Sequence, residues 1–273
     1  MPYANGDGVR IYYEVEGQGP PLVLGHGGGD SLEMWRRAGY TDALNDAFQL
    51  ILFDLPGHGK SEKYDRTEDG NRKLGDRSGK PDLKNRSPRG VVAVLDSLGI
   101  EKAHYFGYSA GASLGFRLAL HHAERFQSFV LGGMTPYAWP ETMVKAVDIS
   151  IDLYKQLLAE PEQYLLRMQR LLGRPLTAED REHFLNQDAE ARIAGLSSLI
   201  DSAPMTDGEL ASISTPCLIF CGELDPFHAG ALEAARHMPR VRFVSMPGLD
   251  HIRALMRRDL VVPHIKKFID DVS

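Results

Sequence analysis

The chain has 273 residues, of which 43% are hydrophobic and 25% are charged, and its formal net charge is -6. This length suits one large domain or one domain with an inserted subdomain, and the composition is ordinary for a soluble globular protein. The acidic excess argues against electrostatic binding of nucleic acid, and no stretch is apolar for long enough to span a bilayer. Because no basic segment followed by an apolar one opens the sequence, we expect a cytoplasmic protein without a membrane partner.

Short apolar runs alternate with longer helical patterns along most of the chain. This alternation predicts an α/β fold, in which a mostly parallel central sheet carries helices on both faces. Residues 9–16 alternate apolar and polar positions and end in a Gly/Pro cluster, which predicts an antiparallel strand at the edge of that sheet. The other expected strands are residues 21–24, 50–53, 104–106, 128–131, 218–220 and 241–245.

Two segments interrupt this rhythm. Residues 63–89 are charged and nearly free of large apolar side chains, which predicts a surface loop or, as an alternative, a gating loop over the site. Residues 136–204 show only helical patterns, among them 143–158, 161–172 and 188–200. We expect this block to be a helical lid over the carboxyl ends of the strands, inserted between the two parts of the core, 1–135 and 205–273. A lid in that place would set substrate choice.

Residues 107–111 read Gly-Tyr-Ser-Ala-Gly and lie between an expected strand and an expected helix. A serine on such a sharp turn has its hydroxyl pushed away from the backbone, and the flanking glycines permit the crowding that the turn requires. The bare pattern is weak, but its position between strand and helix makes Ser109 a candidate nucleophile.

A serine hydroxyl needs a general base and an acid that orients the base. His251 follows the expected strand 241–245, and Asp225 follows the strand 218–220, so both fall at the sheet edge from which Ser109 emerges. Glu223 and Asp250 compete as the acid, with surface ion pairs as their default role. The chain order Ser, Asp, His is that of the α/β-hydrolases.

Backbone amides are expected to bind the developing oxyanion, since they are fixed in place before the reaction. One follows the nucleophile, at Ala110, and the other comes from the His-Gly-Gly-Gly stretch at residues 26–29, with Gly28 as first choice. The alternative for this stretch is a plain strand-to-helix turn. Phosphate-binding loops are excluded here, because the glycines do not have the required spacing.

Taken together, the motifs at residues 26–29, 54–61, 107–111, 222–226 and 247–251 resemble the α/β-hydrolase superfamily, in its branch of small lidded esterases, enol-lactonases, perhydrolases and carbon-carbon bond hydrolases. The resemblance covers nearly the whole chain and implies the fold and the triad. It also implies that the loop 54–61 is structural, so that its histidine is not catalytic. The long segment 63–89 and the residues around the nucleophile depart from the usual pattern, which leaves the pocket shape and the reaction subtype open.

The leading hypothesis is a serine hydrolase that cleaves a small carboxylic ester or lactone through an acyl-enzyme on Ser109, with no cofactor and a small-molecule substrate as its partner. Alternatives are a carbon-carbon bond hydrolase or perhydrolase with the same triad, and a small-molecule receptor that retains the triad. The only two cysteines, Cys217 and Cys221, are four residues apart on one strand, about 13 Å, so we expect free thiols, and no metal site is expected. The expected pocket walls are Trp35, Tyr108, Met134, Tyr137, Trp139 and Phe227.

Overall fold

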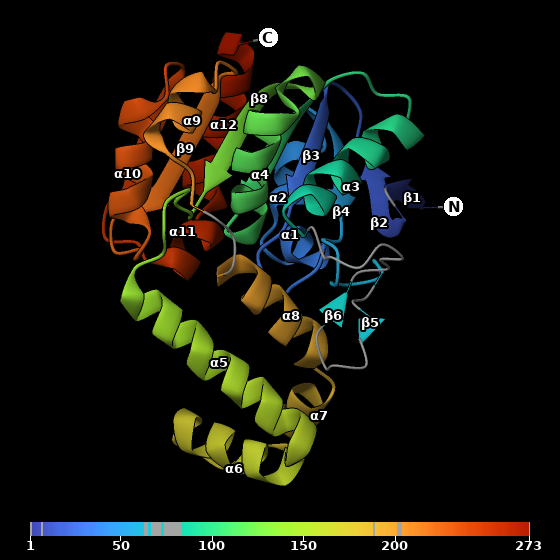
Figure 1. Cartoon of the computed structure of the whole chain (residues 1–273), viewed down its shortest axis with the longest axis vertical. Helices are drawn as coiled ribbons and strands as arrows, with labels where there is room; N and C mark the ends of the chain where they lie inside the picture. The colour runs from blue at the N-terminus through green and yellow to red at the C-terminus, as the bar shows by residue number, and fades with distance from the viewer. Residues whose placement is uncertain are drawn as a thin grey trace.

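An eight-stranded sheet forms the centre of the computed structural model (Figure 1). Its strands lie in the order β1-β2-β4-β3-β7-β8-β9-β10; the pairs β1/β2 and β2/β4 are antiparallel, and the others are parallel. The predicted α/β architecture is confirmed. The strands are β1 (Tyr3–Gly6), β2 (Val9–Glu16), β3 (Pro21–Gly25), β4 (Gln49–Phe53), β7 (Ala103–Tyr108), β8 (Phe126–Gly132), β9 (Cys217–Gly222) and β10 (Val241–Met246). The structure describes residues 2–6, 8–62, 65–66, 72–73, 83–187, 189–200 and 204–272.

The expected antiparallel strand is present as β2, but it does not lie at the edge of the sheet. The short strand β1 pairs outside it, with Tyr3 opposite Tyr12. This strand was missed because its four residues, Tyr-Ala-Asn-Gly, contain no apolar run.

Helices cover both faces of the sheet, as the alternation of apolar runs predicts. On one face α3, α4, α9 and α10 enclose a core around Tyr105 and Phe129. On the other, α1, α2, α11 and α12 enclose a core around Trp35 and Phe106. The helices of the two faces are α1 (Glu33–Arg37), α2 (Tyr40–Leu44), α3 (Leu83–Ser97), α4 (Ala110–His121), η1 (Ala123–Arg125), α9 (Asp207–Ser212), α10 (His228–His237), α11 (His251–Met256) and α12 (Arg258–Val272).

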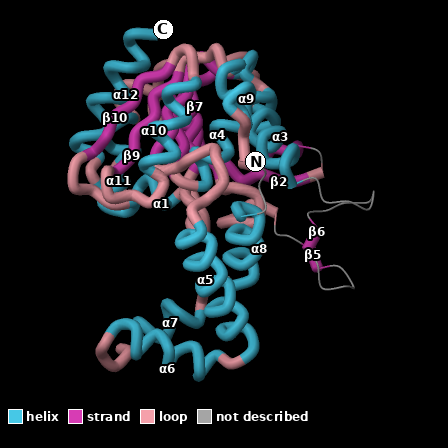
Figure 2. The backbone as a smooth tube through the Cα atoms, turned by 60° about the vertical axis from the view of Figure 1, so that its left-hand side comes forward, coloured by secondary structure: helices cyan, strands magenta, loops and turns pink. Residues whose placement is uncertain are grey.

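Four further helices, here called the inserted helices, follow β8 and precede α9. They are α5 (Glu141–Ala159), α6 (Pro161–Leu172), α7 (Ala178–Leu185) and α8 (Ala189–Ile200). Figure 2 shows them extending away from the sheet, with α6 and α7 farthest from it. They have a small core of their own around Leu157, Tyr164 and Leu165.

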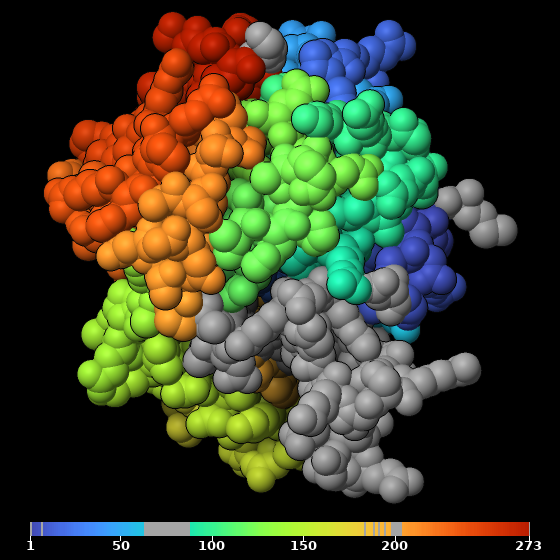
Figure 3. Space-filling model, turned by 45° about the horizontal axis from the view of Figure 1, so that its top comes forward, coloured from blue at the N-terminus to red at the C-terminus, as the bar shows by residue number. Residues whose placement is uncertain are grey.

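The two ends of this insertion lie side by side. The main-chain N–H of Met205 donates to the carbonyl oxygen of Pro136 at 2.9 Å. Beside this bond, the Tyr137 hydroxyl donates to the Asp207 carboxylate at 2.7 Å, at the start of α9. In the space-filling view the yellow-green first part of the insertion lies directly beneath the orange segment that contains α9 (Figure 3).

The last seven residues of the predicted surface loop, 83–89, belong to a helix. Leu83 begins α3, and the helix continues through Pro88, so residues 83–89 are helical. The burial of Val91, Val94 and Leu95 against the sheet accounts for a helix in this place. Apart from the two-residue strands β5 (Asp65–Arg66) and β6 (Arg72–Lys73), the remainder of the predicted loop lies outside the described residues.

No helix within the described ranges combines the length and apolar character needed to cross a membrane. Cys217 and Cys221 are both buried on β9 as free thiols, as the strand spacing predicts.

Candidate active site

Ser109 occupies the tight turn between β7 and α4. Its φ is 54° and its ψ is -113°, and among the described residues it is the one non-glycine residue with a positive φ. Such a conformation costs about 1–3 kcal/mol and persists only where the surroundings impose it. They do so here, because a Cβ at Gly107 would overlap the main chain of Gly111, and a Cβ at Gly111 would overlap that of Gly25. The turn therefore needs both glycines of the motif.

Three side chains from distant parts of the chain form one hydrogen-bonded series. Asp225 Oδ2 lies 2.7 Å from His251 Nδ1, and His251 Nε2 lies 3.1 Å from Ser109 Oγ. With the Nδ1 proton donated to the carboxylate, Nε2 is free to accept the serine proton. The Asp225 side chain is fully buried, whereas that of His251 is 26% exposed, so a ligand can reach the imidazole.

The two competing acids have other partners. Asp250 caps α11, its Oδ1 accepting the N–H of Arg253 at 2.8 Å. Glu223 accepts the N–H of Gly248 at 3.2 Å. The geometry therefore favours Asp225 as the acid that orients His251.

The expected oxyanion donors are the main-chain N–H groups of Gly28 and Ala110. The neighbouring N–H groups are occupied: that of Gly27 donates to Met34 Sδ at 3.3 Å, and that of Gly29 donates to His58 Nε2 at 3.1 Å. Within the described part of the chain, no acceptor pairs with the N–H of Gly28 or Ala110. Ala110 also begins α4, where the helix dipole favours negative charge.

A buried pair of histidines supports the loop of residues 26–29, here called the glycine loop. Neutral His26 donates from Nδ1 to the Gly27 carbonyl at 2.7 Å and accepts the N–H of Leu55 at Nε2 at 3.0 Å. Burial lowers the pKa of His26 to about 4, so the ring is neutral at physiological pH. The ring of His58 packs edge-on against it, with centroids 5.4 Å apart. His58 thus supports the loop, in keeping with the structural role implied for residues 54–61.

Among the expected pocket walls, Trp35 is a correction. It is fully buried in the core, where its ring packs on Tyr40 and Phe106, with centroids 5.4 and 4.6 Å away. Its neighbour Met34, which the sequence reasoning missed, lies closer to the site. A Cβ at Gly27 would lie 3.5 Å from Met34 Sδ and 3.7 Å from the Cβ of Ser109.

Tyr108 also lies elsewhere than expected. It is 1% exposed, and its hydroxyl donates to the main-chain carbonyl of His251. The ring packs against the imidazole, with centroids 5.3 Å apart. Tyr108 therefore supports the histidine from the core side and does not line an open pocket.

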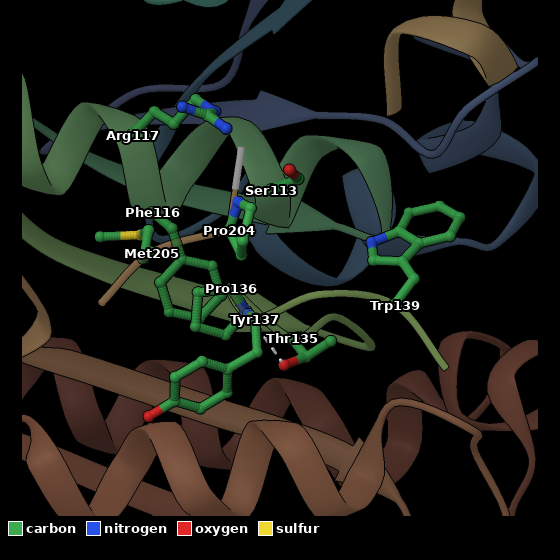
Figure 4. A pocket seen from close by; sticks show the side chains of 9 residues that line it. All are labelled: Ser113, Phe116, Arg117, Thr135, Pro136, Tyr137, Trp139, Pro204 and Met205. Atoms are coloured by element: carbon green, nitrogen blue, oxygen red, sulfur yellow. Dashed lines mark hydrogen bonds between the residues drawn. The ribbon is translucent and has the colours of Figure 1, made fainter. Parts of the chain in front are cut away.

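Two of the remaining candidates, Phe227 and Trp139, form a path of aromatic contacts away from His251. The ring centroid of Phe227 lies 5.8 Å from that of His251 and 5.0 Å from that of Trp139. Phe227 and Met134 are almost fully buried, at 2% and 1% exposed. Trp139 and Tyr137 line a surface pocket with Arg117 and Ser113 of α4, and Trp139 and Arg117 lie at opposite ends of it (Figure 4). With a volume of about 10 Å³ this pocket has room for about one water molecule, so in this state it does not hold a substrate.

The arginine of α8 is a further residue that the sequence reasoning missed. A Cβ at Gly29 would overlap the Arg192 guanidinium, which therefore lies directly against the glycine loop. The same guanidinium lies over the Tyr154 ring, 6.0 Å from its centroid. No cluster of histidine, cysteine and carboxylate side chains suited to a metal ion occurs within the described residues.

Comparison with known proteins agrees with the fold described above. The family model of the alpha/beta hydrolase fold matches residues 20–211. A 2-hydroxy-6-oxononadienedioate/2-hydroxy-6-oxononatrienedioate hydrolase from Burkholderia vietnamiensis is 30% identical over 82% of this chain and 77% of its own length. A pimeloyl-[acyl-carrier protein] methyl ester esterase from Nitrosomonas europaea is 28% identical over 89% of this chain and 93% of its own length. Two matches of higher identity are shorter: the chain spans 43% of the relative from Azorhizobium caulinodans and 50% of the one from Paraburkholderia phymatum.

Solved structures share the whole architecture. The enol-lactonase from Burkholderia xenovorans superimposes with a TM-score of 0.72 at 23% identity, over 98% of this chain and 100% of that one. A likeness at this identity shows the fold alone, whereas the family model covers more than half of the chain. The chain belongs to the α/β-hydrolase fold family, whose relatives named here are hydrolases.

Proposed function

We propose that this protein is a serine hydrolase that cleaves a small carboxylic ester or lactone. The observation that carries the proposal is the series Asp225, His251, Ser109, with spacings of 2.7 and 3.1 Å, ending at a serine in a strained turn. Relatives named as an esterase and an enol-lactonase support the same substrate class.

The reaction follows from the positions of the protons. Ser109 Oγ attacks the acyl carbon as its proton passes to His251 Nε2, and Asp225 stabilises the imidazolium that forms. The N–H groups of Gly28 and Ala110 donate to the oxyanion of the tetrahedral intermediate. When the intermediate collapses, the bond from carbon to the leaving oxygen breaks, and that oxygen takes the proton from His251. A water molecule, deprotonated by His251, then attacks the acyl carbon. The bond from that carbon to Ser109 Oγ breaks, Oγ takes the proton from His251, and the acid is released.

The inserted helices, within residues 136–204, serve in this proposal as a lid that sets substrate choice. Two contacts support it: Arg192 of α8 lies against Gly29, and Gly195 of the same helix packs on His58. Gly29 belongs to the glycine loop, and His58 supports that loop by accepting the N–H of Gly29. These contacts place α8 where its movement would change access to the loop beside Ser109.

The direct test is Ser109→Ala assayed on p-nitrophenyl esters and lactones of graded chain length. Loss of the nucleophile is expected to lower kcat by at least about 10³-fold. A fluorophosphonate is expected to label the wild type at Ser109, as mass spectrometry of the peptides would show. Ser212→Ala, which removes an exposed hydroxyl bonded to the Glu209 carbonyl, is the matched control. Wild-type turnover by Ser109→Ala would refute the proposal.

A second candidate is hydrolysis of a carbon-carbon bond in a substrate that bears a carboxylate. Arg192 favours it, because a guanidinium against the glycine loop can bind a carboxylate, and the described residues supply no ion pair to it. The relative from Burkholderia vietnamiensis is named as a hydrolase of such dioates. In this case Arg192→Gln is expected to raise KM for a dienone dioate at least about tenfold and to leave KM for a neutral ester unchanged.

A further inference from the structure

The main chain of His251 is held by a residue adjacent to the nucleophile. Tyr108, the last residue of β7, donates its hydroxyl to the carbonyl oxygen of His251, the first residue of α11. Ser109 follows Tyr108 directly in the chain. One side chain therefore links the strand that carries the nucleophile to the helix that carries the base.

The position of the Tyr108 ring is fixed on several sides. A Cβ at Gly133 would lie 2.6 Å from the ring, and the ring of Phe220 packs with its centroid 5.9 Å away. The imidazole of His251 packs against the same ring, tilted by 46°. Burial raises the pKa of the Tyr108 phenol above its usual range, so the hydroxyl remains a hydrogen-bond donor throughout the working pH range.

The same helix has a second, more distant attachment. The hydroxyl of Tyr40 in α2 donates to the carbonyl oxygen of Leu255 at 2.9 Å, four residues after His251. Tyr40, like Tyr108, is almost fully buried. The two tyrosines make bonds of the same kind to α11, but only Tyr108 also touches the imidazole.

We propose that Tyr108 is a positioning residue for His251: its hydroxyl fixes the main-chain carbonyl and its ring supports the imidazole, which together hold Nε2 at 3.1 Å from Ser109 Oγ. Tyr108 does not touch the reacting atoms and acts through the histidine. This inference rests on the proposed function, because it presumes that Ser109 and His251 react as nucleophile and base. It also explains why a large buried tyrosine precedes the nucleophile, where an open pocket wall was expected.

Tyr108→Phe tests the inference, since it removes one oxygen atom and keeps the ring and its packing. Misplacement of the imidazole is expected to lower kcat by about ten- to a hundredfold while KM changes less than about twofold. The rate constant for inactivation by a fluorophosphonate is expected to fall in parallel, because it depends on proton transfer from Ser109 to His251. A side chain that only stabilised the fold would change the melting temperature and leave both rates unchanged.

Tyr40→Phe is the matched control, because it removes an equivalent buried hydroxyl bond from the same helix. Tyr40→Phe is expected to lower the melting temperature by about as much as Tyr108→Phe does. It is expected to keep kcat within about twofold of the wild type. The inference is overturned if folded Tyr108→Phe keeps wild-type kcat and labelling rate, or if Tyr40→Phe loses as much activity. Should Tyr108→Phe fail to fold, Tyr108→Met, which lacks both the hydroxyl and the ring but fills the core flexibly, is expected to lower kcat and the labelling rate at least as much, and wild-type rates in it would overturn the inference.

Failure of this inference is distinguishable from failure of the proposed function. If the wild type is labelled at Ser109 and Tyr108→Phe is labelled equally fast, the positioning role is wrong and the hydrolase remains. If the wild type is not labelled and Ser109→Ala keeps full turnover, both are wrong.

Discussion

Asp225 is buried with fixed donors on both of its carboxylate oxygens. Oδ2 accepts the Nδ1 proton of His251, and Oδ1 accepts the N–H of Phe227 at 3.0 Å. A buried carboxylate is tolerated only with such partners. The thiol of Cys221 lies beside it, and burial and the nearby carboxylate raise the pKa of that thiol above its usual range. Cys221 is therefore an inert neighbour of the acid and not a second nucleophile.

Asp225→Asn is expected to lower kcat by about 10³- to 10⁴-fold with little change in KM, because a neutral amide cannot stabilise the imidazolium and favours the wrong tautomer of His251. Steady-state kinetics on an ester and a melting curve check this. Asp250→Asn is the control: asparagine also caps helices, so α11 keeps its start and kcat is expected within about twofold of the wild type. Equal losses in the two variants would contradict the assignment of the acid.

The candidate triad could be chosen from sequence because each member follows a recognisable strand, and parallel strands bring their carboxyl ends to one edge. The pocket walls could not be chosen in this way. Trp35 and Met34 are adjacent on a helix of only five residues, too short for its apolar period to show which of the two faces the site. Arg192 carried no signal, because a single arginine in a helical pattern is ordinarily a solvated residue.

At the scale of elements, α8 is the inserted helix that reaches the glycine loop. A Cβ at Gly195 would lie 2.9 Å from the ring of His58, which is closer than real Cβ atoms approach. The ring cannot move aside cheaply, because Nδ1 donates to the Pro56 carbonyl and Nε2 accepts the N–H of Gly29. The absence of a side chain at Gly195 thus lets α8 lie close to the loop.

Gly195→Val is expected to displace α8 from His58 and with it the Arg192 side chain from Gly29. If the inserted helices bind the acyl group, KM rises by about tenfold or more while fluorophosphonate labelling of Ser109, which needs only the triad, slows less. Gly208→Val in α9 is the matched control, because a Cβ there meets only Thr206 Oγ1, at 4.0 Å. An unchanged KM in Gly195→Val would contradict a role of α8 in binding.

Most helices and strands could be predicted because their apolar residues recur at regular spacing. Elements without such a pattern were missed. α6 begins at Pro161 and ends at Leu172, the range expected from its pattern. α7 was missed because its eight residues are mostly polar and its stability comes from a capping box, in which Thr177 and Asp180 exchange hydrogen bonds. The hydrogen bonds of the capping box fix where this helix begins. Because the helix has no apolar stripe, the hydrophobic pattern of the sequence does not indicate it.

For the molecule as a whole, the two cores on either side of the sheet enclose histidines that must remain neutral. His26 follows β3 and His104 lies on β7, and neither side chain is exposed. Burial lowers the pKa of each to about 4. The Nδ1 of His104 lies 2.8 Å from the hydroxyl oxygen of Ser128, and its Nε2 is buried without a hydrogen-bond partner among the described residues. Protonation of either ring would place an uncompensated charge in the core.

The free energy of unfolding is therefore expected to fall as pH drops below about 6.5, the ordinary histidine pKa. In the unfolded chain both rings take up a proton near that pH, whereas in the fold they do so only near pH 4, so the unfolded state binds more protons in between. Each histidine then costs about 1.4 kcal/mol of stability per pH unit over this window, and the loss ends near the folded pKa. Above about pH 6.5 both contributions are fully present.

Urea unfolding of wild type and His104→Met at pH 7.5, 6.5, 5.5 and 5.0 checks this expectation. The free energy of unfolding of the variant differs from that of the wild type by a constant amount, because Ser128 loses its hydrogen-bond partner. Below pH 6.5 the slope of this free energy against pH is expected to be smaller in the variant than in the wild type, the difference being about 1.4 kcal/mol per pH unit. His264→Gln, which changes an exposed histidine of α12, is measured beside it as the control for the loss of a histidine from the surface. Because the offset is the same at every pH, the slope alone decides the result. Parallel curves for His104→Met and wild type would show that His104 takes up its proton equally in the folded and unfolded states.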